Sequence, residues 1–216
     1  MKKGFNLLIV ILILLISPAF YVFSQDEGYV KTANNAMVNK DYAKAIEYYN
    51  KAIEHQATFA PSFYGRGLAN LNLDKQTEAM ADFTKAIELK ADYHQAFFGR
   101  GLIYYKQGDM VKAKSEFSSA VSIDNKTSNY YYALGNIAYL NKNLDEALVN
   151  YSKAIELDPQ NGIAYYGRAI THKVSSRFEP AIKDFEAYLK LNGDKDGLQN
   201  EVNRMLGESR NPRKKK

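Results

Sequence analysis

The chain has 216 residues, of which 46% are hydrophobic and none is cysteine. This composition allows a sizeable packed core and excludes disulfides, thiolate metal sites and a cysteine nucleophile. The formal charge of +5 comes from the two ends of the chain, because residues 4–209 carry 22 basic and 24 acidic side chains. A body of net charge −2 argues against nucleic-acid binding, which needs a basic face.

The first 24 residues are predicted to be a secretory signal peptide. Two lysines precede a dense apolar run over residues 7–16, and Val22 and Ser24 occupy the small-residue positions before a possible cut. The alternative is an uncleaved membrane anchor, because residues 5–23 nearly reach the roughly 20 residues that span a bilayer. In both cases we expect the rest of the chain outside the cytoplasm, in the periplasm or cell envelope of a Gram-negative bacterium.

The sequence repeats with a period of 34 residues and without any insertion, over five contiguous repeats. In every repeat the twentieth residue is alanine, the eighth is alanine or glycine, and the fourth and twenty-fourth are aromatic. A fixed period of this size is typical of solenoid arrays. The repeats span residues 26–59, 60–93, 94–127, 128–161 and 162–195.

Each repeat is predicted to form two antiparallel helices joined by a short turn. In the first repeat, Ala45, Ile46, Tyr49, Ala52 and Ile53 follow the spacing of one helical face. Residues that break or cap helices lie in the middle of every repeat. One such pair cannot bury its apolar face alone, so the repeats are expected to stack on their neighbours.

The antiparallel register predicts which residues meet inside a repeat. The eighth residue should face the twenty-fourth, so that a tiny side chain admits an aromatic ring, as Gly67 would admit Phe83. The seventh residue is arginine in three repeats, and the twenty-third is acidic in the same three. We therefore expect salt bridges between the two helices of these repeats, which pair Arg66 with Asp82, Arg100 with Glu116 and Arg168 with Asp184.

The C-terminal end is predicted to close the array. Residues 196–208 should form a capping helix, because Leu198, Val202, Met205 and Leu206 fall on one helical face. Residues 209–216 are expected to be a basic disordered tail.

The repeat pattern resembles that of the tetratricopeptide repeat (TPR) family, whose repeat is a 34-residue helix–turn–helix. The stretch Tyr130 to Asn161, YYYALGNIAYLNKNLDEALVNYSKAIELDPQN, matches the family consensus well, and the resemblance covers residues 26–195. It implies an all-α fold, a right-handed α-solenoid of five TPR units with a C-terminal capping helix. The first helix of each unit would line a concave face that holds a partner's extended peptide or helix.

The resemblance places the second, fifth, sixth, ninth, twelfth and thirteenth residues of each repeat on this concave face. For the fifth residue, packing between repeats is an equally good interpretation. Aromatic residues at helical spacing belong more often to the core than to a binding surface. The sixth residue, which is Gly65 in the second repeat, would leave the concave wall bare beside the aromatic rings. The expected groove residues are aromatic at positions five and twelve and asparagine at position nine: Tyr64, Phe98, Tyr132, Tyr166, Tyr105, Tyr139, Asn34 and Asn136.

The function expected from these features is a non-enzymatic scaffold that binds a protein partner. The lysine, arginine and asparagine set that holds chaperone tails in one TPR subclass is missing. Histidines 55, 94 and 172 share no metal-binding spacing, and no motif indicates catalysis, a metal or a cofactor. Two alternatives remain, a self-assembling structural protein and a binder of anionic surfaces through the basic tail, and membrane contact is expected only through an uncleaved N-terminus.

Overall fold

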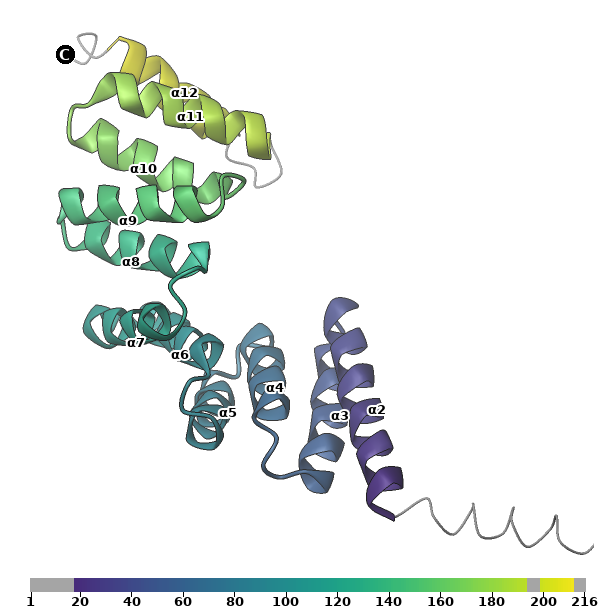
Figure 1. Ribbon diagram of the computed structural model, residues 1–216. Coiled ribbons are helices and arrows are strands. Elements are labelled where there is room, and N and C mark those ends of the chain that lie inside the picture. Colours follow the sequence, from purple (N-terminus) through teal and green to yellow (C-terminus); the bar gives the residue numbers. More distant parts are fainter. Residues whose placement is uncertain (1–17, 194–198, 212–216) are drawn as a thin grey trace, which may run out of the picture. The chain divides into compact units, whose positions relative to one another are not determined.

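The structure is a computed structural model that describes residues 18–193 and 199–211. Within these ranges the chain is helical and has no strand, which confirms the all-α prediction. Five helix pairs follow one another, and a single helix, α12, comes after them (Figure 1). The pairs are α2 (Pro18–Val38) with α3 (Tyr42–His55), α4 (Ala60–Asn72) with α5 (Gln76–Leu89), α6 (His94–Lys106) with α7 (Met110–Ile123), α8 (Ser128–Leu140) with α9 (Leu144–Leu157), and α10 (Gly162–Val174) with α11 (Phe178–Asn192); α12 is Gln199–Arg210.

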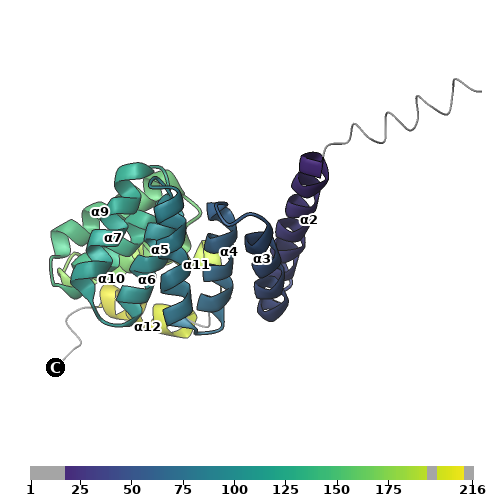
Figure 2. The ribbon, with the colours of Figure 1, turned by 90° about the horizontal axis from the view of Figure 1, so that it is seen from below.

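The helices begin in the same register in successive repeats. First helices start at residues 60, 94, 128 and 162, and second helices at residues 42, 76, 110, 144 and 178, always 34 residues apart. The chain divides into two compact halves, Met1–Ile103 and Tyr104–Lys216. Within each half, consecutive helices pack side by side, as α2 and α3 do in both views (Figures 1 and 2).

The first helix departs from the expected boundary. α2 begins at Pro18 rather than near residue 26, so it runs through the expected cleavage position after Ser24. The remainder of the predicted signal segment, residues 1–17, lies outside the described residues. Among the helices that the structure describes, none has both the length and the apolar character needed to cross a bilayer.

The turn inside every repeat has one geometry. Its central residue, at repeat position fifteen, adopts a left-handed conformation with φ between 58° and 80°. The next residue donates its backbone N–H to the carbonyl oxygen five residues earlier, for example Asn143 to Ala138 at 2.9 Å. This is the Schellman arrangement that ends many helices. Only one of the five left-handed residues is glycine: Lys40, Asp74, Gly108, Lys142 and Ser176.

The aromatic ring at position twenty-four forms the core between consecutive repeats. A Cβ atom added to Gly67 would lie 2.8 Å from the ring of Phe83 in the same repeat, and one added to Gly99 would lie 2.7 Å from that ring in the next. The same sandwich holds Tyr151, between Gly135 and Gly167. The predicted contact between positions eight and twenty-four is therefore present in these repeats.

The prediction that Gly65 leaves a concave wall bare is wrong. Gly65 is buried, and a Cβ atom there would lie 2.5 Å from the hydroxyl oxygen of Tyr49, which belongs to the preceding repeat. Gly99 and Gly167, from the same series of sixth residues, likewise lie against rings of the preceding repeat. Small residues at position six thus make room for the neighbouring repeat rather than for a partner.

The C-terminal helix α12 packs against α11 (Figure 1). Val202 and Leu206 are buried on Phe185 and Tyr188, while Glu201 and Arg204 face solvent. The helix extends to Arg210, so the first two residues of the expected tail are helical, and Arg210 pairs with Glu186 at 2.7 Å. Leu198 and residues 212–216 lie outside the described residues.

Candidate partner-binding face

The aromatic residues expected in a groove are half-buried and pack within their own repeats. The Tyr64 ring centroid lies 5.8 Å from that of Phe83, and Tyr132 lies 6.0 Å from Tyr151. Tyr166 lies 5.3 Å from Tyr188. Each of these rings is therefore held by the second helix of its repeat and still keeps part of its surface open. Phe98, Tyr105 and Tyr139 are half-buried as well.

The two asparagines expected to bind a partner's backbone each accept a hydrogen bond from a tyrosine of their own repeat, although Asn34 is exposed and Asn136 half-buried. The Tyr49 hydroxyl donates to Asn34 Oδ1 at 2.6 Å, and the Tyr151 hydroxyl donates to Asn136 Oδ1 at 2.7 Å. The sequence contains this signal, because position twenty-four is tyrosine only where position nine is asparagine. The other three repeats combine phenylalanine with leucine or isoleucine. Asparagine at position nine therefore satisfies a buried hydroxyl, which would otherwise be costly.

Three tyrosines lie near Tyr151 in the C-terminal half. Burial is the main cause that raises the pKa of Tyr151 far above its ordinary value, and the neighbouring Tyr132, Tyr105 and Tyr139 add to the shift. Burial also raises the pKa of Tyr105, with Tyr132 as its neighbour. The raised pKa values keep the hydroxyls of Tyr151 and Tyr105 protonated at physiological pH, so these two residues offer hydrogen bonds beside aromatic surface.

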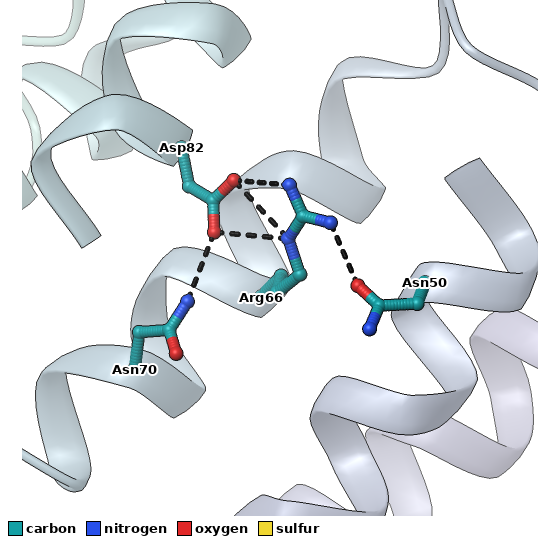
Figure 3. Close-up of polar contacts among 4 residues, drawn as sticks. All are labelled: Asn50, Arg66, Asn70 and Asp82. Atoms are coloured by element: carbon teal, nitrogen blue, oxygen red, sulfur yellow. Dashed lines mark hydrogen bonds and ion pairs between the residues drawn. The ribbon is translucent and has the colours of Figure 1, made fainter. Parts of the chain in front are cut away.

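Two of the expected salt bridges are present in the structure. Arg66 donates to Asp82 through Nη2 at 2.6 Å and Nε at 3.0 Å, and Asn70 adds a bond to the same carboxylate at 3.1 Å (Figure 3). Arg168 holds Asp184 with two bonds of 2.8 Å. The third pair, Arg100 with Glu116, stays a prediction.

Each of these arginines also contacts the preceding repeat. Arg66 Nη1 donates to Asn50 Oδ1 at 2.7 Å (Figure 3), and Arg168 Nη1 donates to Ser152 Oγ at 3.0 Å. Arg100 reaches Thr84 Oγ1 in the same way at 3.3 Å. The arginine at position seven therefore connects position twenty-five of one repeat with the next repeat, which makes it a structural residue rather than a ligand for phosphate.

The charges are divided unequally between first and second helices. α4, α6, α8 and α10 contain no aspartate or glutamate, whereas every second helix contains at least one. The first helices are instead rich in tyrosine, phenylalanine, leucine and isoleucine. They therefore present surfaces that would not repel an acidic partner.

The structure adds three residues that the sequence did not single out. Leu140, Lys142 and Val174 line a pocket of about 390 Å³ together with Tyr139 and Leu144. Leu140 and Val174 are 49% and 55% exposed, although both are apolar. They occupy position thirteen in consecutive repeats, so the sequence places them together, but only the structure shows that they stay uncovered.

The described residues contain no group of three or more acidic, histidine or cysteine side chains placed to hold a metal ion. His172 is partly buried, and its Nδ1 has no hydrogen-bond partner. Burial lowers the pKa of His172, and Asp184 opposes that shift. This histidine lies beside the Arg168–Asp184 salt bridge.

Comparisons with known families and structures identify the repeat. A tetratricopeptide repeat model matches residues 128–161, and a second model of that description matches residues 33–57 and 94–127. A TPR repeat model matches residues 72–108, so the matches together cover more than half of the chain. No curated protein sequence matches the chain significantly.

Solved structures with the same fold include several bacterial proteins. YrrB, described as a TPR protein with an unusual peptide-binding site, is 22% identical with a TM-score of 0.61, over 82% of this chain and 91% of that one. MamA from Desulfovibrio magneticus RS-1 is 19% identical with a TM-score of 0.66, over 80% and 97%. PilF from Pseudomonas aeruginosa is 13% identical with a TM-score of 0.75, over 88% and 94%.

At these identities the structures share the fold alone. Proteins with this fold are typically non-enzymatic and serve as scaffolds for protein–protein interaction. The 34-residue register, the helix pairs and the family matches agree with one another: the chain belongs to the tetratricopeptide repeat family.

Proposed function

We propose that this protein is an exported scaffold that binds a segment of a partner protein on the exposed faces of its first helices. The observation that carries the proposal is the half-exposed aromatic surface of α4, α6, α8 and α10, which contain no acidic residue. An aromatic ring that packs on its own repeat on one side and is exposed to solvent on the other is a rigid anchor for a partner. Buried aromatic residues of this kind contribute much of the binding energy of protein interfaces.

The helical surface itself favours a partner peptide or helix over a small molecule. On α8 and α10 the exposed positions recur along each helix, so that a binding segment would meet several of them in succession. Ile163 and Val174 are 39% and 55% exposed on α10, and Leu140 is 49% exposed on α8. Apolar side chains uncovered along one face are the usual mark of an interaction surface.

A photo-crosslinking experiment tests this surface. A photoreactive phenylalanine analogue is placed at Leu102 or Ile163, on first helices, and at Val111 or Val149, on second helices; all four side chains are exposed. We expect crosslinks to a different protein from the first-helix positions only. Crosslinks from the second helices alone would contradict the proposal. Crosslinks solely between copies of the chain would instead favour the self-assembling alternative.

The cellular location is part of the proposal. It is supported by the apolar run over residues 7–16 that follows two lysines. Expression of the full chain in a Gram-negative host, followed by osmotic release of the periplasm and N-terminal sequencing, is the direct test. A mature N-terminus at Gln25 in the released fraction supports the signal peptide, retention with the membrane at full length supports the anchor, and recovery from the cytoplasm contradicts both.

A further inference from the structure

The pocket at the turn of the fourth repeat suggests what kind of partner segment the surface takes. Tyr139 and Leu140 come from the end of α8, Leu144 from the start of α9, and Val174 from the end of α10. The volume of about 390 Å³ lies at the lower end of the usual range for binding pockets, about 300–1,000 Å³. It suits one bulky apolar side chain.

The apolar lining is exposed without any described side chain to cover it. Leu140 and Val174 retain 49% and 55% of their accessible surface, although neighbouring apolar side chains such as Ile137 are fully buried. Two uncovered aliphatic side chains beside a tyrosine form a concave apolar surface, and covering them with an apolar group would be favourable.

Lys142 supplies the only uncompensated charge of the pocket lining. It is exposed, its backbone is held in the left-handed turn with φ 60°, and its ammonium group forms no ion pair among the described residues. The two acids that follow the turn are already engaged, since Asp145 pairs with Arg177 at 3.2 Å and Glu146 pairs with Lys114 at 2.6 Å.

No acidic residue of the first helices competes for this lysine, because neither α8 nor α10 contains one. Lys173, the other lysine near the end of α10, is paired with Glu208 at 2.7 Å. The positive charge of Lys142 is therefore available to a partner. A single ammonium group is suited to one side-chain carboxylate, whereas recognition of a chain terminus usually uses several converging donors.

We infer that this pocket binds a bulky apolar side chain of the partner segment, with an adjacent aspartate or glutamate placed on Lys142. The inference rests on the proposed function. It specifies that the partner segment contains an apolar residue next to an acidic one. Tyr139 contributes the aromatic wall of the pocket, and Leu140 and Val174 contribute its aliphatic walls. Lys142 favours partner segments that carry an acidic residue at this point.

The experiment selects random dodecapeptides displayed on phage against the full chain. Enriched sequences are synthesised with acetylated and amidated ends, and their binding is measured by fluorescence anisotropy. We expect leucine, isoleucine or phenylalanine next to an acidic residue in the enriched peptides. Replacement of that acidic residue by its amide should weaken binding about two- to fivefold, as for an exposed ion pair.

Variants of the chain provide the matched comparison. Leu140→Glu and Val174→Glu should weaken binding at least about tenfold, because they place a charge in the apolar pocket. Val149→Glu alters an equally exposed valine, 69% accessible, on α9 and should change nothing. When the phage library is selected for binding to the Lys142→Glu variant, the enriched peptides should carry lysine or arginine in place of the acidic residue. All four sites are exposed, so thermal unfolding should stay unchanged.

Four results would contradict the inference in distinguishable ways. In the first, the peptides still bind Leu140→Glu and Val174→Glu but no longer bind Ile163→Glu. This result would support the proposed function and show that the pocket is not the binding site. Binding that is seen only when the same peptides are also synthesised with a free C-terminal carboxylate would show that the chain terminus, and not a side-chain acid, meets Lys142. A dimer that Val174→Glu dissociates, seen by light scattering, would make a second copy the occupant. Failure to enrich any peptide would count against the proposed function and the inference together.

Discussion

Gly65 and Gly67 are two residues apart on α4 and receive aromatic rings from different repeats. Gly67 lies against Phe83 of its own repeat and Gly65 against Tyr49 of the preceding one. Glycine in a helix costs about 1 kcal/mol relative to alanine. That cost is offset here because any larger side chain would displace a ring from the core.

Substitution of Gly65 by alanine should therefore destabilise the protein. The added methyl group would meet the Tyr49 ring, so we expect a loss of about 1–3 kcal/mol in the free energy of unfolding, as for other overpacked cores. Urea unfolding followed by circular dichroism measures the change. Gly28→Ala is the control, because a Cβ atom there would meet nothing within 4 Å. Helix propensity should make this control neutral or up to about 1 kcal/mol more stable.

The bond between Tyr151 and Asn136 makes a second prediction. Asn136→Leu would leave the buried Tyr151 hydroxyl without its acceptor, which should cost about 1–3 kcal/mol. The double variant Asn136→Leu/Tyr151→Phe should recover most of that loss, because it recreates the combination of leucine and phenylalanine found in two other repeats. A double-mutant cycle by urea unfolding measures the coupling. Equal and additive losses from the two single changes would show that the bond contributes nothing.

His172 predicts a pH dependence. Its pKa is lowered in the folded protein, chiefly by burial, so below about pH 6.5 the unfolded chain takes up the proton more readily. Stability should therefore fall as the pH drops from about 7 through 6.5 towards the lower folded pKa. Asp184 opposes this shift, while Arg168 and Arg177 reinforce it.

The variant His172→Asn isolates this effect. Asparagine is the natural residue at the same repeat position in α4, where Asn70 donates to Asp82 at 3.1 Å. Unfolding free energies measured at pH 5 and pH 7.5 should differ less for the variant than for the unaltered chain. Identical pH dependence in both proteins would show that His172 does not contribute.

Residue contacts within a repeat were predictable, and those between repeats were not. The turn fixes the register of an antiparallel helix pair, so the sequence alone places Gly67 opposite Phe83. The neighbour of Gly65 depends on how one repeat rotates against the next, which the turn does not determine. The link between Asn136 and Tyr151 was visible in the repeat alignment as covariation, although position nine had been assigned to the groove.

Helix boundaries at the element scale follow from the turn and its capping residues. Asp41, Asp109 and Asn143 each accept a hydrogen bond from the backbone N–H three residues later, which caps the second helix of the repeat. Lys75 and Arg177 occupy the same position without a capping side chain. Two of the five second helices therefore lack a stabilising feature that the others have.

Lys75→Asp should therefore stabilise the N-terminal half. The carboxylate would accept a hydrogen bond at the start of α5, for a gain of about 1 kcal/mol. Asp109→Ala, at the equivalent position before α7, should cost about the same amount. Thermal unfolding of the two variants compares them, and a stabilised Asp109→Ala would contradict this explanation of the caps.

Most elements could be predicted from the sequence because each repeat gives the same periodicity again. The exceptions are the outer ends of α2 and α12, where no neighbouring repeat fixes the boundary. α2 continues back to Pro18, and α12 continues to Arg210, where Ser209 is buried and bonds to the Met205 carbonyl oxygen at 2.9 Å. The apolar pocket was not predictable either, since periodicity does not show which apolar side chains remain uncovered.

At the scale of the whole molecule, α12 closes the apolar end of the fifth repeat. Deletion of residues 199–216 should expose Phe185 and Tyr188, both fully buried in the intact protein. We expect faster amide hydrogen exchange in α10 and α11, while α2 to α5 keep their protection, because repeats are stabilised by nearest neighbours. Deletion of residues 211–216 alone should change nothing. Uniformly faster exchange along the chain would contradict local coupling.

The ring shared between consecutive repeats also bears on how such a chain can change in length. Removal of residues 60–93 would join the first repeat to the third and bring Tyr49 opposite Gly99, where Phe83 now lies. Arg100 would then find Asn50 in place of Thr84. The junctions at Gly65, Gly99 and Gly167 use interchangeable parts. Duplication or loss of a 34-residue segment between two of them therefore preserves the core, and gene evolution can adjust the number of repeats without redesigning these interfaces.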